Sequence, residues 1–216
     1  MTQAVDFRFE ILFLLLVAIT LVTLVVAIGM AIAKRSSTAK KLLKMLGIGW
    51  GAYFAIVLVV AAATPQRVIP MNHDLCFDEM CFAVVNVQTA SQLGPPSQPV
   101  RADGAFYIVT VRASSRARGR AQSEHGLRAL LWSPGKTFDV SANGQAAWDT
   151  AHPENVALTV RLRPGEAALS DQVFDVMTQS PELGVVLTNG FTPGFFVIGE
   201  CPLLHKPTIF RVSPDR

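Results

Sequence analysis

The chain begins with two long apolar runs and then changes to short segments in which apolar and polar residues alternate. Residues 11–33 and 45–63 contain no charged side chain. A helix needs roughly 20 apolar residues to cross the hydrocarbon core of a bilayer. The pattern therefore predicts a short N-terminal tail and two transmembrane helices, over about 11–33 and 43–64. A cleaved signal peptide is disfavoured, because the first run is too long for one and has no basic segment before it.

The segment between the two runs, residues 34–44, is basic and has no acidic residue. Its basic residues are Lys34, Arg35, Lys40, Lys41 and Lys44. Such residues beside membrane segments stay in the cytoplasm. We therefore expect a cytoplasmic loop, with the N-terminus and everything after the second helix outside.

The remaining charge is nearly balanced. Residues 65–216 hold 13 basic and 14 acidic side chains, a net charge of −1, so the basic excess of the chain lies in the first 64 residues. The basic excess therefore indicates membrane topology, and it does not favour nucleic acid as a partner.

Gly47, Gly51 and Ala55 recur every four residues in the second run. Small residues at this spacing let another helix approach closely. That helix belongs either to a second copy or to the same chain. We expect the first helix of the same chain, because a short loop already tethers it. Neither run contains a charged residue, which disfavours transport or a proton relay.

After an expected Pro-bounded linker at residues 65–75, the pattern has a period of two. Segments rich in Val, Ile, Phe and Thr are predicted as strands at 81–88, 105–113, 127–133, 136–141, 155–163, 172–178, 183–188, 194–199 and 208–213. No stretch beyond the apolar runs has a convincing helical period. Short strands at this spacing predict an antiparallel, immunoglobulin-like β-sandwich over residues 76–216.

The stretch MNHDLCFDEMC, residues 71–81, contains two of the cysteines. In a tight hairpin with Asp78 and Glu79 as its turn, Cys76 faces Cys81 at a distance that a disulfide spans. An extracytoplasmic domain lies in an oxidising compartment, which favours the disulfide. Glu is a poor residue where a turn needs positive φ, so a looser turn is the alternative.

A copper or zinc site is the alternative use of the same stretch. Its ligands would come from His73, Cys76, Cys81 and Met71 or Met80, joined by Cys201 and His205 if the tail folds back. The cysteine spacing is not a standard zinc spacing, which disfavours this reading. A catalytic thiol pair is also disfavoured, because redox motifs usually separate their cysteines by two residues. Cys201 is the odd cysteine, either free or bridged, and we expect no cofactor.

Arg112, Arg116, Arg118 and Arg120 are concentrated in residues 112–126. The segment is either a solvated hairpin loop, the commoner case, or an arm that binds an acidic partner or anionic lipid. The sequence has no Gly-x-Ser-x-Gly elbow, no phosphate-binding loop and no His-Glu-x-x-His helix. We therefore expect that the protein is not an enzyme.

The segments VALTVRLRPGEAALSDQVFDV, ELGVVLTNG and GAFYIVTVRASS resemble a bacterial family of secreted or membrane-anchored immunoglobulin-like domains. The family includes mycobacterial immunogenic secreted proteins, and the resemblance covers about residues 80–190. It implies a sandwich fold and an envelope location, and it supplies no catalytic residues. We therefore expect a bacterial inner-membrane protein that presents its outer domain to an envelope partner or ligand. Handling of copper or zinc is the alternative function.

Overall fold

The computed structural model describes residues 7–177, 182–188 and 206–212. Within these residues the chain divides into two compact units, a helical unit that ends at Gln66 and a β unit that begins at Arg67. The expected order, with apolar helices first and strands after them, is confirmed.

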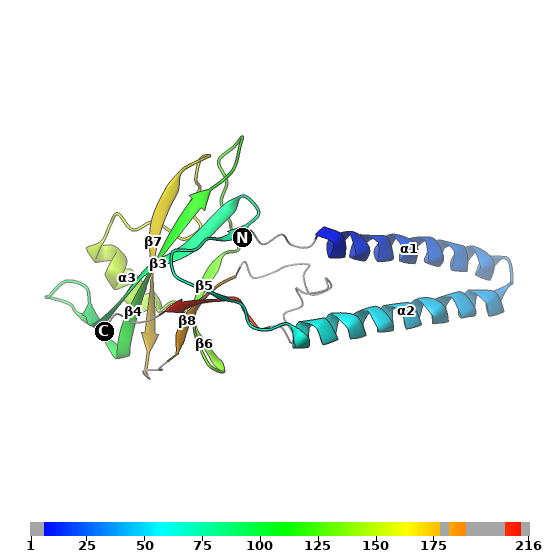
Figure 1. Ribbon diagram of the computed structural model, residues 1–216, viewed down its shortest axis with the longest axis horizontal. Coiled ribbons are helices and arrows are strands. Elements are labelled where there is room, and N and C mark those ends of the chain that lie inside the picture. The colour runs from blue at the N-terminus through cyan, green and yellow to red at the C-terminus, as the bar shows by residue number, and fades with distance from the viewer. Residues whose placement is uncertain (1–6, 178–181, 189–205, 213–216) are drawn as a thin grey trace. The chain divides into compact units, whose positions relative to one another are not determined.

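The helical unit is an antiparallel hairpin of α1 (Phe7–Ile32) and α2 (Ser36–Ala63) (Figure 1). Both helices are long and apolar enough to cross a membrane, by length and composition. Lys34 lies between them with a positive φ of 58°, which a continuous helix does not allow. Because α2 begins at Ser36, most of the expected basic loop forms the first turns of a helix.

A narrow face joins the two helices. Val57 and Ala61 of α2 are 1% and 0% exposed, and Tyr53 beside them is also buried. Phe13 and Leu16 of α1 pack against this face. Since Tyr53, Val57 and Ala61 follow one another at intervals of four residues, they form one stripe along α2.

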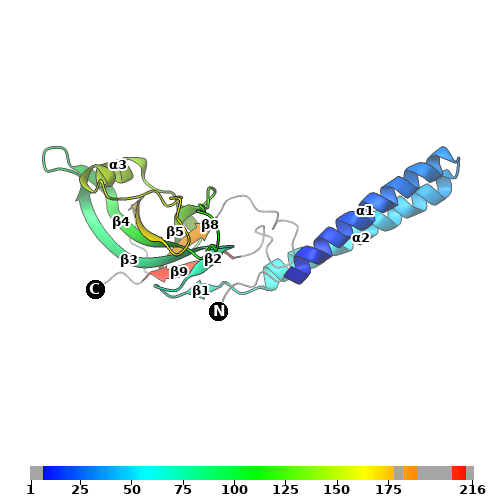
Figure 2. The ribbon, with the colours of Figure 1, turned by 90° about the horizontal axis from the view of Figure 1, so that it is seen from above.

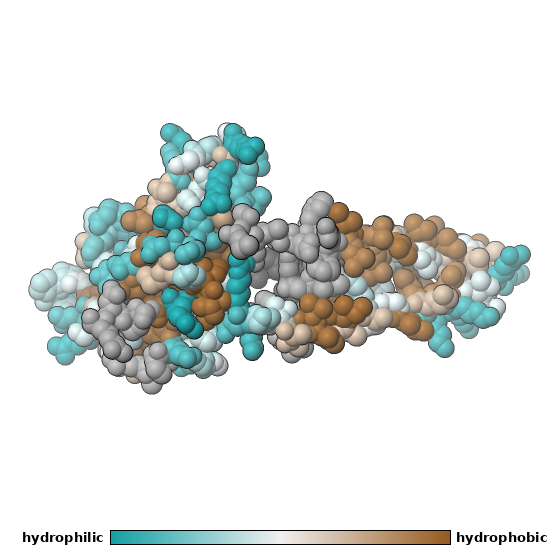
Figure 3. All heavy atoms as spheres, viewed as in Figure 1, coloured by the Kyte–Doolittle hydropathy of each residue, from teal (hydrophilic) through white to brown (hydrophobic). Residues whose placement is uncertain are grey.

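A polar link crosses the same contact. The Trp50 Nε1–H donates to the Thr20 hydroxyl at 3.0 Å, and that hydroxyl donates to the Leu16 carbonyl oxygen at 2.8 Å. Trp50 also meets the ring of Phe13 edge to face, with 6.4 Å between centroids. Elsewhere the two helices expose many large apolar side chains, and hydrophilic residues gather at the turn between the helices (Figure 3).

The stripe of small residues lies outside the contact between α1 and α2. Nothing lies within 4 Å of the position that a Cβ would take at Gly47 or Gly51, and both residues are exposed, as is Ala55. The structure therefore packs α1 against a different face of α2 from the one we expected. The physical reason is that the larger Tyr53 and Val57 side chains bury more apolar area against α1 than glycines can.

The β unit is a sandwich of two sheets, as the sequence predicts. In the part of the chain that the structure describes, one sheet has the strand order β1-β9-β8-β5-β6 and the other β2-β3-β4-β7. Their bounds are β1 (Val68–Ile69), β2 (Leu75–Phe77), β3 (Met80–Leu93), β4 (Val100–Ser115), β5 (Arg128–Ser133), β6 (Lys136–Phe138), β7 (Ala167–Val176), β8 (Leu183–Thr188) and β9 (Ile209–Val212).

The core lies between the sheets, and β4 shows how the sequence builds it. Its residues Tyr107, Val109 and Val111 belong to the large cluster shared with the facing sheet. The alternate residues Phe106 and Ile108 point to the other face and form a second cluster there. A strand that is buried on both faces has a continuous apolar sequence, which explains the run AFYIVTV.

A helix that the sequence analysis missed covers that second face. α3 (Ala142–Ala151) begins at Ser141, whose hydroxyl accepts the Gly144 N–H at 3.2 Å as an N-cap. Its Ala147 packs into the cluster that contains Phe106 and Ile108 of β4. In Figure 2 the long, curved β3 and β4 run past α3.

Two further predictions about strands were wrong. Residues 155–163 form no strand; they hold one isolated bridge, from Leu162 to Gln122. Leu158 and Leu162 still lie in the core. The alternation of apolar and polar residues therefore reflects which side chains are buried, although the segment forms no regular secondary structure. The sandwich is also not fully antiparallel, because Val68 and Ile69 of β1 pair in parallel with β9. The predicted strand at 194–199 lies outside the described residues.

Candidate functional site

The β2–β3 hairpin carries the expected disulfide. Cys76 and Cys81 are opposite each other across the hairpin, with 3.9 Å between their Cα atoms, and their sulfurs are bonded. Asp78 takes a positive φ of 53°, while Glu79 does not. The turn thus avoids the conformation that Glu disfavours, and the predicted register of the hairpin is confirmed.

This disulfide bears on the alternative metal site. Metal ligation by cysteine uses thiolates, and a disulfide holds both sulfurs in another bond. Met80 is 2% exposed and belongs to the sandwich core, whereas the His73 ring is exposed and its Nδ1 lies 3.3 Å from the Met71 carbonyl oxygen. Within the described residues no three His, Cys, Asp or Glu side chains converge. Cys201 and His205 lie outside those residues.

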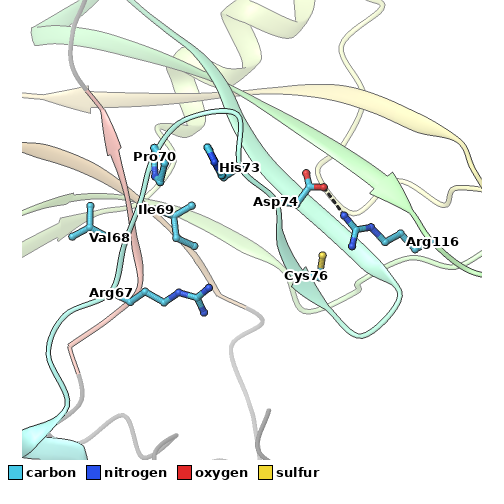
Figure 4. A pocket seen from close by; sticks show the side chains of 8 residues that line it. All are labelled: Arg67, Val68, Ile69, Pro70, His73, Asp74, Cys76 and Arg116. Carbon is cyan, nitrogen blue, oxygen red and sulfur yellow. Dashed lines mark hydrogen bonds and ion pairs between the residues drawn. The ribbon is translucent and has the colours of Figure 1, made fainter. Parts of the chain in front are cut away.

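A pocket of about 380 Å³ lies beside the disulfide (Figure 4). It is formed by β1, the turn that follows it and the start of β2, with one residue that comes directly after β4. The lining residues are Arg67, Val68, Ile69, Pro70, His73, Asp74, Cys76 and Arg116. Residues 67–75, expected to be a linker, therefore supply β1 and most of the pocket wall.

Asp74 organises the basic side of the pocket. Its two carboxylate oxygens accept one hydrogen bond each, from Arg112 Nη2 at 3.1 Å and from Arg116 Nη2 at 2.8 Å. The side chains of Asp74, Arg112 and Arg116 are 27%, 39% and 54% exposed. Pairs this exposed add little stability, so their main effect is to orient the guanidinium groups.

The other two predicted arginines are placed differently. Arg118 and Arg120 are exposed in the segment after β4, and neither side chain has a partner among the residues that the structure describes. The four candidate arginines therefore divide into an ion-paired half beside the pocket and a solvent-facing half.

Arg67 is a basic residue of the pocket that the sequence analysis did not single out. Its carbonyl oxygen accepts the Ile209 N–H at 3.0 Å, which holds its backbone beside β9. Figure 4 shows its side chain reaching in from the β1 side, opposite Arg116. A signal existed in the sequence, because Arg67 is the first charged residue after the second apolar run.

A serine–histidine pair also occurs in the β unit. The Ser123 hydroxyl oxygen lies 2.6 Å from His125 Nδ1. A catalytic pair needs a third group that orients the histidine, and in the described ranges no carboxylate contacts the His125 ring. The pair is a local contact in an exposed loop.

A tighter polar network joins α3 to β7. The Trp148 Nε1–H donates to Asp171 Oδ2 at 3.1 Å, and the Asn155 side-chain amide donates to Asp149 Oδ1 at 2.7 Å. The His152 ring stacks on Trp148 with 3.8 Å between centroids. The bond from Trp148 to Asp171 anchors the helix to the sheet, and the other two contacts brace the end of the helix, so the network has a structural role.

Comparisons with known proteins return structural likenesses. No family model matches the chain, and no curated protein matches it. A conserved hypothetical protein from Bacillus anthracis has a TM-score of 0.47 at 17% identity, over 56% of this chain and 91% of that one. MPT63, a secreted protein from Mycobacterium tuberculosis, has a TM-score of 0.46 at 14% identity, over 69% of this chain and 100% of that one. An uncharacterized β-sandwich protein from Clostridium difficile 630 has a TM-score of 0.41 at 8% identity, over 69% and 96%.

The resemblance to mycobacterial secreted β-sandwich proteins is therefore confirmed as a structural match. At these identities and TM-scores the likeness transfers no activity, ligand or partner. The chain is similar to secreted and uncharacterised bacterial β-sandwich proteins, preceded here by two long apolar helices.

Proposed function

We propose that this protein is anchored in a bacterial inner membrane by α1 and α2 and holds a non-catalytic β-sandwich outside the cytoplasm, where the sandwich binds an envelope partner. The outward surface of the helical hairpin carries this proposal. Val22, Val25 and Met45 are 64%, 70% and 70% exposed, and large aliphatic neighbours surround them. An apolar surface of this extent is unfavourable in water and matches the hydrocarbon core of a bilayer.

Two independent features support the orientation. The basic residues lie at the turn between the helices, which favours a cytoplasmic turn and puts the chain after α2 outside. The Cys76–Cys81 disulfide belongs to the β unit, and disulfides persist in oxidising compartments. The basic turn and the disulfide therefore both favour a position of the sandwich outside the cytoplasm.

The exposed segment after β4 is the proposed partner surface. Arg118 and Arg120 project from it with unpaired guanidinium groups in the described structure. The guanidinium group of arginine can donate two parallel hydrogen bonds to one carboxylate or phosphate, so the partner would present acidic groups.

Site-directed labelling tests the orientation. In a Cys201→Ser background the native disulfide leaves no free thiol, and an exposed residue of each unit is changed to cysteine. We expect a membrane-impermeant maleimide to label Ser97→Cys in intact spheroplasts and to label Ser37→Cys only after permeabilisation. The reverse pattern would contradict the orientation, and release of the chain by alkaline carbonate would contradict anchorage.

A further inference from the structure

The pocket beside the disulfide is tied to the end of α2 by a very short piece of chain. Arg67 is separated from Ala63, the last residue of α2, by Thr64, Pro65 and Gln66. Even fully extended, these steps span at most about 14 Å. The headgroup layer on each side of a bilayer is roughly 5–8 Å thick. If α2 spans the membrane, Arg67 must therefore lie in or just above the outer headgroups, however the two units are oriented.

Arg67 is also a cation whose guanidinium group has no partner among the described residues. Its guanidinium makes no ion pair or hydrogen bond with any residue that the structure describes, while its carbonyl oxygen is bonded to the Ile209 N–H. The hydrogen bond from Ile209 therefore holds the backbone of Arg67, while its guanidinium group can bind a ligand. An arginine in this state can donate in parallel to two oxygens of one phosphate.

Arg116 supplies a second set of donors from the opposite wall. One nitrogen, Nη2, donates to Asp74, and a guanidinium has five N–H groups in all. Asp74 neutralises one positive charge, but Arg112 shares the same carboxylate. Arg67, Arg112 and Arg116 set against Asp74 leave the cluster with an excess of positive charge.

The remaining residues that line the pocket suit a position at the membrane surface, where apolar and charged groups meet. Val68 and Pro70 are exposed apolar residues beside Arg67, and Ile69 is buried. A volume of about 380 Å³ is within the range of small-ligand pockets. His73 Nδ1 lies 3.3 Å from the Met71 carbonyl oxygen, so this ring nitrogen already has a partner and we count no phosphate contact from it.

We infer that this pocket binds the phosphate of an anionic phospholipid in the outer leaflet, held between Arg67 and Arg116. The inference rests on the proposed anchorage, because the membrane brings the lipid to the pocket. It adds a ligand class and a site to that proposal. Bound lipid would fix the β unit close to the bilayer surface.

The test uses the full chain purified in an uncharged detergent. Native mass spectrometry measures the binding of phosphatidylglycerol and of phosphatidylcholine. Lys40, Lys41 and Lys44 are kept in every variant, because the topology and the disulfide depend on them, so any lipid that they bind is common to all variants. Arg67→Gln is compared with Arg101→Gln, a change of the same charge at an exposed residue with no side-chain partner in the described ranges.

We expect phosphatidylglycerol to bind more tightly than phosphatidylcholine, and Arg67→Gln to weaken its binding about fivefold. Arg101→Gln should change binding less than twofold. An equal loss in the two variants, or no loss in Arg67→Gln, overturns the inference. Inorganic phosphate forms the second arm: if it displaces the lipid at millimolar concentration and its own binding depends on Arg67, the pocket is a free-phosphate site and the lipid assignment is wrong.

The outcomes separate this inference from the anchorage. A chain that is labelled as expected in spheroplasts but shows no preference for phosphatidylglycerol overturns the pocket inference and leaves anchorage standing. A chain that alkaline carbonate releases overturns both the anchorage and the lipid source.

Discussion

A Cβ atom at Gly144 would lie 2.9 Å from both Phe106 Cε1 and Val173 Cγ1. Glycine at this position lets the first turn of α3 approach the sheet closely enough for Ala147 to join the cluster beneath it. The requirement is for space, since Gly144 does not have a positive φ. One hydrogen in place of a methyl group thus determines how closely α3 can dock.

The first prediction concerns this approach. Gly144→Ala should lower the free energy of unfolding by about 1–3 kcal/mol, because the added methyl group overpacks the contact. Gly119→Ala is the control, since nothing lies within 4 Å of the Cβ position there. Denaturant unfolding of the full chain in detergent measures both variants. Equal stability of the two variants would show that the side chains of the sheet beneath α3 can move to accommodate the added methyl group.

The second prediction concerns the disulfide. The loop that it closes is short, and loop-closure entropy gives a stabilisation of about 2 kcal/mol. Cys76→Ala should lose about this amount, and reductant should destabilise the wild type but not the variant. Cys201→Ser serves as the control in the same unfolding measurement. If reductant destabilises Cys76→Ala as much as the wild type, the disulfide that stabilises the protein is not the Cys76–Cys81 bond.

At the scale of elements, contact faces are selected by the side chains that fill them. The hairpin buries Tyr53, Val57 and Ala61 and leaves Gly47 and Gly51 open. Both sets of residues recur every four positions along α2, so spacing alone does not decide which set contacts α1. The contact that forms is the one that unites rings and branched side chains across the two helices.

The third prediction compares the two stripes. Ala61→Leu should destabilise the hairpin by about 1–3 kcal/mol, because Ala61 is 0% exposed and has no room for a larger side chain. Gly51→Leu should leave the hairpin unchanged, since its Cβ position is open. Unfolding of helical structure in a denaturing detergent, followed by circular dichroism, tests the pair. The opposite ranking would mean that α1 packs on the small-residue stripe.

α3 and the segment 155–163 show where pattern reasoning at this scale failed. The sequence ANGQAAWDTA has small apolar residues and little helical contrast, and it forms a helix over an apolar sheet face with a serine cap at its start. Residues 155–163 alternate like a strand because Leu158 and Leu162 reach the core, yet their backbone pairs with no sheet edge beyond one bridge. In both places tertiary burial outweighed the local pattern.

At the scale of the whole molecule, the proposed anchorage links the charge distribution of the chain to its redox chemistry. The basic residues at the hairpin turn favour one topology, and that topology puts the cysteines of the β unit in an oxidising compartment. Changing the turn should therefore alter the oxidation state of a distant disulfide.

The fourth prediction follows from this link. Gln is substituted at all five basic positions of the turn: Lys34, Arg35, Lys40, Lys41 and Lys44. We expect a mixed topology in which part of the population has free thiols at Cys76 and Cys81. The control removes basic residues from the β unit instead, as Arg101→Gln, Arg118→Gln and Arg120→Gln. Intact-mass thiol counting after denaturation reads both variants, and an unchanged count in the first would contradict the charge-directed topology.

The sequence by itself determined the features that depend on neighbours along the chain. Two apolar runs become two long helices because each satisfies its backbone hydrogen bonds internally. Cys76 faces Cys81 because a tight turn sets the register between them. The strands β5 and β8 appear close to their predicted ranges, since alternation and flanking turn residues are also local.

Tertiary structure alone decided the features that depend on which surfaces meet. The parallel pairing of β1 with β9 brings Arg67 to the pocket, and the hairpin register places Asp74 between Arg112 and Arg116. Likewise α3 forms over the face of β4 that Phe106 and Ile108 occupy. None of these partners is near in sequence. Their meeting follows from burying the largest apolar area between two sheets, a quantity that belongs to the folded chain as a whole.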